Sequence, residues 1–404
     1  IHGVQVLDTL ENIQVAVASL RDRGIAPQRL VLTKDNMDGV RVRQIVEAAS
    51  ACRLTLARLP RITDFKAGVT DKLEIKPVAV EDLLGRPQVP LDREAMARLI
   101  AGRKVLITGA AGFIGSNFVR MMLSRSESIK LVSYDKLTYA GSLDNLQNIE
   151  NENNHTFIHG DIADEQQVFN ALREHTIDTI VHFAAESHVD NSITGPKAFF
   201  ETNVMGTFTL LEAARQYWQE ELKLDDRSCR FHHVSTDEVY GTLGVDDPGF
   251  TELTPYAPNS PYSASKAGSD HAARSYFHTY KLPVTVSNCS NNYGPYQHAE
   301  KLIPVIIQRC LDQKAIPVYG DGSNIRDWLF VDNHCDAIEC IISNGEVGEV
   351  YNVGGNNELS NLALVKEICK LMDHYVPQNS PHEQLIAFVE DRKGHDWRYA
   401  IDGF

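Results

Sequence analysis

The chain reads Thr108-Gly109-Ala110-Ala111-Gly112-Phe113-Ile114-Gly115 between a predicted strand at 104–108 and a predicted helix that runs to about residue 124. The glycines of this G-x-x-G-x-x-G run permit a tight turn and let the backbone approach a pyrophosphate closely. The first turn of the helix supplies free N–H groups and a favourable dipole. An incidental glycine-rich turn is the alternative, but it does not explain why a strand and a helix flank the run. The stretch therefore predicts a dinucleotide site in a Rossmann-like α/β fold.

Short apolar strands and amphipathic helices alternate after this stretch. Further strands are predicted at 130–134, 156–159, 178–183, 231–235 and 284–288. Parallel strands need crossover helices, so these six units predict a doubly wound parallel sheet with helices on both faces. After about Asn292 prolines and glycines interrupt the rhythm, and we expect a smaller C-terminal substrate lobe that closes over the carboxyl edge of the sheet. The predicted domains are 104–292 and 293–404, interleaved in space.

Residues 1–103 have a separate pattern. A strand at 29–32, a helix at 40–51 and a strand at 55–59 predict a partial Rossmann-like α/β accessory domain over 1–60. The proline-rich segment 61–103 is predicted to be a linker with short helices. The chain begins at Ile1 rather than at Met, so we expect a further segment upstream of it.

Charge and cysteine spacing exclude several classes of function. The 404 residues include 39 basic and 54 acidic ones, and the net charge of −15 gives no electrostatic footprint for nucleic acid. The seven cysteines are scattered and never spaced as C-x-x-C, so neither a disulfide framework nor a metal site is expected. No apolar run reaches the ~18 residues that a membrane helix needs. We therefore expect a cytoplasmic protein with no membrane insertion in this part of the chain.

Two residues at the end of the second strand of the sheet bear on the choice of dinucleotide. Asp135 is placed where a carboxylate can bind the adenosine ribose hydroxyls and would repel a ribose phosphate, which favours NAD over NADP. Lys136 follows it directly, and a cation there could tolerate the phosphate. NAD is the predicted cofactor, and NADP stays open.

The segment Tyr262-Ser263-Ala264-Ser265-Lys266 puts a phenol and an ammonium group on one face of a predicted helix. A nearby cation, together with a positive nicotinamide ring, is expected to lower the pKa of the phenol so that it can take a proton from a sugar hydroxyl. Alone, Y-x-x-x-K usually marks an exposed helix face. The glycine run upstream makes the catalytic interpretation the better one.

A third motif, Ser235-Thr236-Asp237-Glu238-Val239-Tyr240-Gly241, follows a predicted buried strand and so lies at the active edge of the sheet. Two neighbouring carboxyl groups repel each other when both are ionised, so one of them tends to hold a proton. A protonated acid beside an ionised base is what the elimination of water requires. A solvated acidic turn is the alternative, but the buried strand before it favours a functional role.

Together these segments resemble the extended short-chain dehydrogenases and, within them, the dTDP-glucose 4,6-dehydratases. The resemblance covers about 104–402. Besides the three motifs above, it rests on Y-D-K-L-T-Y-A-G at 134–141, H-F-A-A-E-S-H-V-D at 182–190, S-P-Y-S-A-S-K-A at 260–267, S-N-N-Y-G-P at 290–295 and R-K-G-H-D at 392–396.

The resemblance implies a nucleotide-sugar 4,6-dehydratase, a hydro-lyase that oxidises and reduces its substrate on one bound NAD. Tyr262 would deprotonate the hydroxyl at carbon 4, with Thr236 orienting that oxygen and Lys266 supporting the tyrosinate. Glu238 would then remove the proton at carbon 5, while Asp237 would protonate the departing hydroxyl of carbon 6. A homodimer is implied as well.

The resemblance also implies which residues bind each ligand. Those expected at the cofactor are Gly109, Gly112, Phe113, Ile114, Gly115, Asp135, Lys136, Leu137, Thr138, Asp161, Ile162, Phe183, Ala184, Ala185, Ser187, Thr202, Tyr262, Lys266 and Asn292. Those expected at the nucleotide-diphosphate sugar are Ser187, Thr236, Asn291, Lys301, Leu302, Pro317, Tyr319, Arg326, Asn361, Arg392 and His395. For Arg326 alone, a surface salt bridge would be the default interpretation.

Residues 1–103 resemble a different region, the accessory domain of membrane-linked polysaccharide-biosynthesis dehydratases, through V-E-D-L-L-G-R at 80–86 and V-P-L-D at 89–92. This implies attachment to the inner membrane face through the upstream segment, and no second cofactor is expected here. Those relatives act on UDP-N-acetylhexosamines, so UDP-glucose or a UDP-N-acetylhexosamine remains open as the substrate. A nucleotide-sugar 4-epimerase, which has no use for Asp237 and Glu238, and a non-catalytic NAD-binding scaffold also stay open.

Overall fold

The computed structural model describes residues 9, 12–32, 45, 48–49, 52, 54–58, 76–77, 102–126, 128–149, 152–224, 228–391 and 394–402. The chain divides into two compact units, Ile1–Leu91 and Asp92–Phe404. Among the described residues, no helix combines the length and the apolar character that crossing a bilayer requires.

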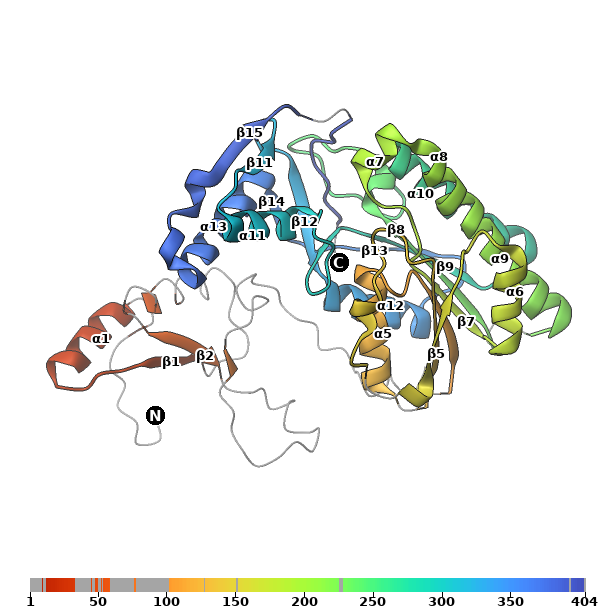
Figure 1. Cartoon of the computed structure of the whole chain (residues 1–404), viewed down its shortest axis with the longest axis horizontal. Coiled ribbons are helices and arrows are strands. Elements are labelled where there is room, and N and C mark those ends of the chain that lie inside the picture. The colour runs from red at the N-terminus through yellow and green to blue at the C-terminus, as the bar shows by residue number, and fades with distance from the viewer. Residues whose placement is uncertain are drawn as a thin grey trace. The chain divides into compact units, whose positions relative to one another are not determined.

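A seven-stranded parallel sheet forms the centre of the unit Asp92–Phe404 (Figure 1). Its spatial order is β13-β9-β8-β7-β4-β5-β6. The strands are β4 (Lys104–Thr108), β5 (Lys130–Asp135), β6 (His155–His159), β7 (Thr179–His182), β8 (Arg230–Thr236), β9 (Val284–Cys289) and β13 (Val350–Val353). Every neighbouring pair is parallel. The predicted Rossmann-like fold class and its six strands are confirmed.

The seventh strand, β13, was not predicted. Its four residues are drawn from the segment after 293, and they pair with β9 from Val350↔Val286 to Val353↔Cys289. This run is only four residues long, contains Asn352 and lies between Gly348 and Gly354. It therefore has no hydrophobic periodicity that would distinguish it from a loop. Its place at the edge of the large sheet is set by tertiary contacts.

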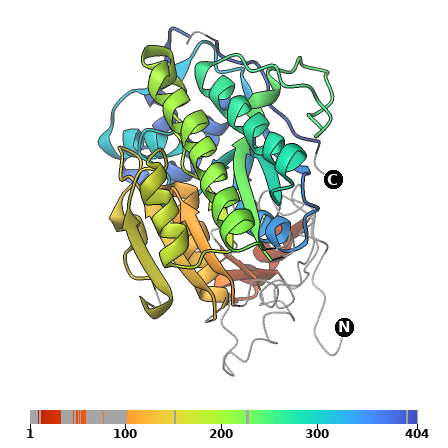
Figure 2. The same cartoon turned by 90° about the vertical axis from the view of Figure 1, so that its right-hand side faces the viewer.

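Helices cover both faces of the sheet, as a doubly wound fold requires. One face packs on α5 (Phe113–Arg125) and α12 (Val331–Asn344), in a core that includes Val105, Ile107, Phe118 and Ile338. The other face packs on α6 (Glu165–Glu174), α9 (Thr207–Arg215) and α10 (Pro261–Tyr280). Figure 2 shows α9 and α10 side by side over this face. The shorter helices of the unit are η3 (Leu143–Leu146), η4 (Glu152–Asn154), α7 (Val189–Thr194), α8 (Pro196–Phe199), η5 (Phe200–Gly206), η6 (Gln216–Glu221) and η7 (Asp237–Tyr240).

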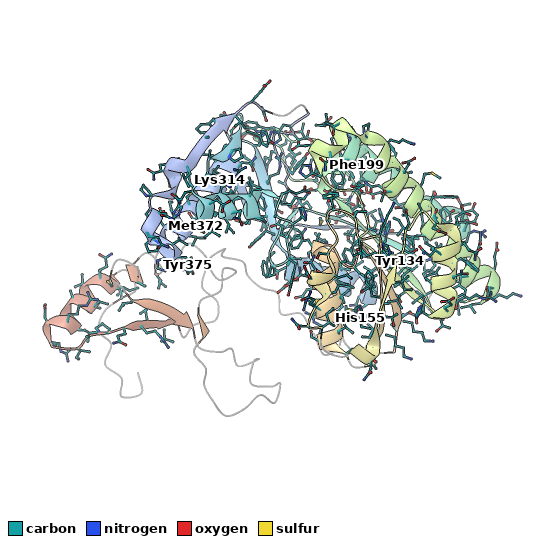
Figure 3. The ribbon with its side chains drawn as sticks, in the orientation of Figure 1. Tyr134, His155, Phe199, Lys314, Met372 and Tyr375 are labelled. Carbon is teal, nitrogen blue, oxygen red and sulfur yellow. The ribbon has the colours of Figure 1, made fainter. Side chains whose placement is uncertain are left out.

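A smaller lobe stands at the carboxyl edge of the sheet (Figure 1). It contains β10 (Asn291–Tyr293), β12 (Ile325–Phe330) and β14 (Glu358–Ser360) in one sheet, and β11 (Ile316–Tyr319) and β15 (Ile386–Val389) in another. Its helices are α11 (Leu302–Asp312), α13 (Asn361–Tyr375), η8 (Pro377–Asn379) and η9 (His382–Leu385). Met372 and Tyr375, labelled in Figure 3, mark the last turn of α13. The lobe has its own core, in which Trp328, Val365 and Cys369 are buried.

The unit Ile1–Leu91 contains α1 (Ile13–Asp22), β1 (Arg29–Leu32), β2 (Thr55–Arg58) and β3 (Lys76–Pro77). β1 and β2 pair in parallel, as the prediction of a βαβ unit requires, and the three described residues of the predicted helix 40–51 are helical. β3 lies in the segment predicted to be a linker and pairs antiparallel to β2. The rest of that segment up to Ala101, with its expected short helices and the motif at 80–86, lies outside the described residues.

Candidate active site

A cleft of about 740 Å³ opens at the carboxyl ends of the strands. The strand order reverses between β4 and β7, and ligands of doubly wound folds bind in the crevice at such a switch point. The cleft is lined by most of the residues expected at the cofactor and the substrate. Leu137 and Asp237 are not part of its lining, and Arg392 lies outside the described residues.

The glycine run connects β4 to α5 in the way the sequence predicts. Gly109 has a φ of +67°, and a Cβ atom added to it would lie 2.6 Å from the backbone nitrogen of Ala184, which follows β7. A Cβ on Gly115 would lie 2.2 Å from the carbonyl oxygen of Gly109. Both positions therefore exclude any side chain. The tight turn aims the first N–H groups of α5, which have no partner within the helix, at the cleft.

Asp135 ends β5 and holds the glycine turn in place. Its carboxylate accepts hydrogen bonds from the backbone N–H of Ala111, at 2.9 Å, and of Leu137, at 2.8 Å. Lys136 forms an ion pair with the carboxylate of Asp161 at 2.6 Å. Burial alone would raise the pKa of Asp161, but the bonds from Lys136 and from the N–H of Ala163 hold it below its ordinary value. Lys136 was the reason why NADP stayed open as the cofactor, and its positive charge is thus neutralised by the carboxylate of Asp161.

Tyr262 and Lys266 lie in the first two turns of α10. Ser260 begins this helix with a capping box in which its side chain and that of Ser263 exchange hydrogen bonds with each other's backbone N–H, and Pro261 occupies the first turn. This fixed start points both functional side chains into the cleft. The Tyr262 ring lies edge-on to that of Phe199, with centroids 6.3 Å apart, and Figure 3 labels Phe199 at the end of α8.

The pKa of the Tyr262 phenol differs from the predicted direction. Its burial, followed by the negative charge of Glu238, raises this pKa well above the ordinary value, while a hydrogen bond with Thr236 lowers it. The ammonium group of Lys266 donates to the carbonyl oxygen of Val234 at 2.9 Å. The predicted lowering depends on the cofactor's positive charge as well as on Lys266, and among the protein's own groups burial and the charge of Glu238 dominate. A bound positive charge is needed to reverse it.

The acidic motif forms the junction of β8 and η7. Thr236 caps this turn by accepting a hydrogen bond from the N–H of Glu238 at 3.3 Å, and its hydroxyl donates to Asp237 at 3.4 Å. Asp237 is 1% exposed, and its second carboxyl oxygen has no hydrogen-bond partner among the described residues. Burial, then repulsion by Glu238 and Asp327, raises the pKa of Asp237 well above its ordinary value. The raised pKa of Asp237 agrees in direction with the protonated acid that the motif was expected to supply.

Residues of the smaller lobe close the far end of the cleft. Arg326 is 5% exposed, donates to the carbonyl oxygen of Asp396 at 3.0 Å, and lies 4.3 Å from the centre of the Tyr399 ring. This burial excludes the interpretation of Arg326 as part of a surface salt bridge. His395 contacts Tyr319 edge-on. Lys301 immediately precedes α11 and donates to the carbonyl oxygen of Ser187 at 3.1 Å, so the lobe is joined to the loop after β7.

Several residues that sequence reasoning did not select also line the cleft. They are Tyr134, Ala140, Gly160, His188, Val189, Asp190, Val234, Ser235, Cys289, Ser290, Gln297, His298, Glu300, Val305 and Trp328. Val234, Ser235, Cys289 and Ser290 lie in the last residues of β8 and β9 or directly after them, and His188, Val189 and Asp190 lie in the segment after β7. That position was a usable signal, because the ends of parallel strands meet at one edge. Asn291, which was selected, places a buried side-chain oxygen there with no hydrogen-bond partner among the described residues.

Comparison with known proteins agrees with this geometry. A family model described as GDP-mannose 4,6 dehydratase matches residues 106–403. The dTDP-glucose 4,6-dehydratase of Xanthomonas campestris pv. campestris (strain B100) is 56% identical over 299 residues, which cover 74% of this chain and 84% of that protein. The chain belongs to the dTDP-glucose 4,6-dehydratase family. The enzyme of that name from Shigella flexneri is 50% identical over 307 residues, covering 74% of this chain and 85% of its own.

Solved structures of this family have the same fold. The dTDP-glucose 4,6-dehydratase DesIV of Streptomyces venezuelae, crystallised with NAD and a TDP ligand, superposes with a TM-score of 0.67 at 46% identity. The match covers 74% of this chain and 88% of that one. A UDP-glucose 4-epimerase of Thermus thermophilus in complex with NAD gives a TM-score of 0.63 at 27% identity, covering 74% and 90% of the two chains.

Proposed function

We propose that this chain is a dTDP-glucose 4,6-dehydratase, which converts dTDP-glucose to dTDP-4-keto-6-deoxyglucose and water with NAD. The observation that carries the proposal is the pair of acids at the end of β8. Asp237 has a strongly raised pKa beside Glu238, which lines the same cleft as Tyr262 and Lys266. The relatives at 50–56% identity carry this name and support the choice of nucleotide.

The residues at the switch point fit a dinucleotide. Gly109 and Gly115 leave no room for side chains where the backbone must approach a pyrophosphate, and α5 presents its N-terminus there. Asp135 supplies a carboxylate at the ribose position, and the pairing of Lys136 with Asp161 favours NAD over NADP. When bound, NAD accepts a hydride from the sugar and later returns one, so the reaction has no net redox change.

Tyr262 is proposed as the base for the hydroxyl at carbon 4. Its phenol shares a hydrogen bond with Thr236, which can orient the same sugar oxygen. The protein's own groups keep the phenol protonated, so it becomes a base only when further positive charge reaches the cleft. Lys266 holds one positive charge on the neighbouring turn, fixed by Val234. This arrangement keeps the base inactive until the cofactor-binding end of the cleft is filled.

Glu238 and Asp237 are proposed to remove water once carbon 4 is a ketone. The ketone acidifies the adjacent carbon-hydrogen bond, and Glu238 takes the proton from carbon 5. Asp237 gives its proton to the departing hydroxyl of carbon 6. Because Asp237 does not line the cleft itself and the Thr236 hydroxyl donates to its carboxyl group, passage of the proton requires that hydroxyl to turn, so that it accepts from Asp237 and donates to the sugar oxygen. The raised pKa of Asp237 favours retention of that proton.

Arg326 and Lys301 are the proposed cationic partners of the substrate. Buried Arg326 offers a planar guanidinium suited to phosphate oxygens, and Lys301 lies at the joint between the lobe and the loop after β7. The proposed domain functions follow from these positions. The part 104–292 binds NAD and performs the chemistry, and the part 293–404 binds the nucleotide sugar.

A nucleotide-sugar 4-epimerase is a second candidate, supported by the fold shared with the UDP-glucose 4-epimerase of Thermus thermophilus. Such a reaction needs Tyr262 and Lys266 but leaves the acid pair without a role. The deciding experiment incubates the protein and NAD with dTDP-glucose and follows product mass. Loss of one water mass supports dehydration, an unchanged mass with altered sugar stereochemistry supports epimerisation, and no turnover supports a binding protein.

A panel of dTDP-, UDP-, GDP- and CDP-glucose and UDP-N-acetylglucosamine, scored by 4-keto product, tests the choice of substrate. If a UDP sugar turned over with the highest kcat/KM, the assignment of dTDP-glucose would be wrong while the reaction would stand.

Two finer proposals concern assembly. We infer a homodimer because Phe200, Met205 and Phe208 expose large apolar side chains on η5 and α9. Light scattering of the purified protein tests this, and a monomer at micromolar concentration would contradict it. The resemblance of residues 1–103 supports attachment to the inner membrane face through an upstream segment, which fractionation of cells that express the full-length protein would test.

A further inference from the structure

Three consecutive residues of β8 hold two side chains of α10. The carbonyl oxygen of Val234 accepts a hydrogen bond from the ammonium group of Lys266 at 2.9 Å. On either side of it, the Ser235 hydroxyl donates to one carboxyl oxygen of Asp270 at 2.9 Å, and the Nε2 atom of His233 lies 3.1 Å from the other. Lys266 and Asp270 are four positions apart in the chain, which places them on one face of α10. The strand therefore anchors an ammonium and a carboxylate on adjacent turns of one helix face, where they interact through their charges without forming a direct ion pair.

Asp270 is a buried carboxylate that the proposed mechanism does not use. It is 0% exposed and also accepts a hydrogen bond from the Tyr256 hydroxyl at 3.0 Å. Tyr256 is held in turn by the side-chain amide of Asn288 at 3.0 Å. Burial raises the pKa of Asp270 to about 6, with Lys266 and the hydroxyl groups of Ser235 and Tyr256 acting against this rise. The group is thus ionised at neutral pH.

Lys266 needs a negative charge because it is almost fully buried, at 4% exposed. Burial lowers the pKa of its ammonium group, and Asp270 is the foremost group that raises it. The buried histidines nearby cannot serve instead. Burial holds the pKa values of His182 and His233 well below their ordinary values, so both are neutral. An uncompensated buried ammonium tends to lose its proton, and with it the support for a tyrosinate.

We propose that Asp270 is a positioning residue that keeps Lys266 in its charged ammonium form and holds it where Tyr262 needs it. The inference rests on the proposed function, in which Lys266 supports the Tyr262 base. Removal of the Asp270 charge lowers the pH at which Lys266 loses its proton. The titratable groups that face this pair come from α10, β7, β8, β9, η7 and the loop before α10. They are His271, His182, His233, Cys289, Tyr240 and Tyr256.

The test is a titration of Lys266 itself. The full chain is labelled with 13C-lysine, the 13Cε resonance of Lys266 is assigned by its loss in Lys266→Arg, and its pKa is read in the parent and in Asp270→Asn. A shift of about 1 pH unit or more to lower pH is expected in the variant. The control is Tyr256→Phe, which removes a hydrogen bond to the carboxylate but leaves its charge, and its Lys266 pKa should stay close to that of the parent. An equal Lys266 pKa in the parent and in Asp270→Asn overturns the proposal.

Catalysis supplies a second readout. The alkaline limb of the kcat/KM profile for water loss should move to lower pH in Asp270→Asn and stay in place in Tyr256→Phe. Failure of the parent to turn over dTDP-glucose would contradict the proposed function. If the parent turns it over and the alkaline limb of Asp270→Asn lies at the same pH as that of the parent, only the role of Asp270 is contradicted.

A third measurement does not depend on the variant folding. In the parent, the Lys266 resonance should show a second inflection near the pKa of Asp270, at about pH 6. This inflection reports the loss of the neighbouring negative charge. If Asp270→Asn does not fold, absence of this inflection in the parent overturns the proposal, and its presence supports it.

Discussion

A Cβ atom on Gly109 would lie 2.6 Å from the backbone nitrogen of Ala184, so the turn after β4 and the chain after β7 meet with no space for a side chain. The φ of +67° at Gly109 adds a backbone cost of about 1–2 kcal/mol for any other residue. The two segments line the cleft together. The contact therefore makes Gly109 a requirement for the shape of the proposed NAD site.

Gly109→Ala should weaken NAD binding by at least about tenfold, because the loop must move away from Ala184 to admit the methyl group. Isothermal titration calorimetry measures the Kd. The matched control is Gly102→Ala, since Gly102 has a φ of +79° and no heavy atom within 4 Å of the added Cβ. The free energy of unfolding of this control should fall by the backbone cost alone. Equal NAD affinities in the two variants would contradict the proposed role of the contact.

Glu238→Gln should allow oxidation at carbon 4 but slow water loss by about 100-fold or more, because a positioned base typically contributes this much. Absorbance of the reduced cofactor and product mass, followed together, separate the two steps. The exposed Glu174 at the end of α6 gives a control, and Glu174→Gln should behave as the parent. Water release by Glu238→Gln at the parental rate would show that another group is the base.

Local patterns were enough for much of the fold. The strands β4, β5 and β7 are mostly apolar runs, and nearly all of their residues are buried, so composition reveals them. The strand β13 could not be found in this way, because Val350–Val353 is short and acquires its strand form only by pairing with β9. The position of the glycine run between a strand and a helix was also readable from the sequence.

The electrostatic properties of the site were harder to predict from the sequence. The unequal acid pair was predicted because Asp237 and Glu238 are neighbours in the chain. The burial of the Tyr262 ring, which raises its pKa when the protein's own groups act alone, was not predicted, because it comes from packing that no local motif encodes. The ion pair of Lys136 with Asp161 was missed for a related reason, since it joins the ends of two strands that are distant in sequence.

Asp237→Asn should make the protein more stable than the parent as the pH rises. The pKa of Asp237 in the folded protein is raised well above the ordinary 3.8, so the folded state holds this proton to a higher pH than the unfolded chain does. The parent therefore loses stability with increasing pH from about pH 4 up to the folded pKa, whereas Asn has no proton to lose. The advantage of the variant should grow by up to about 1.4 kcal/mol per pH unit in this window.

Urea unfolding of the parent and of Asp237→Asn at pH 5 and pH 7 measures this difference. Asp312→Asn is the control, because Lys314 holds the pKa of exposed Asp312 below its ordinary value. That variant should show no gain as the pH rises. A constant difference between Asp237→Asn and the parent at both pH values would mean that Asp237 does not hold its proton.

Asp161→Asn should shift the cofactor preference toward NADP. In the parent the Asp161 carboxylate pairs with Lys136 at 2.6 Å, and its removal frees a cation at the position where a ribose phosphate would lie. Both side chains are partly exposed, and such pairs contribute at most about 1 kcal/mol, so the ratio of the NADP and NAD dissociation constants should fall no more than about fivefold. Asp312→Asn breaks a comparable Lys-Asp pair with Lys314 outside the cleft and should leave the ratio unchanged. If the ratio in Asp161→Asn equals that of the parent, then Asp135 alone determines the preference for NAD.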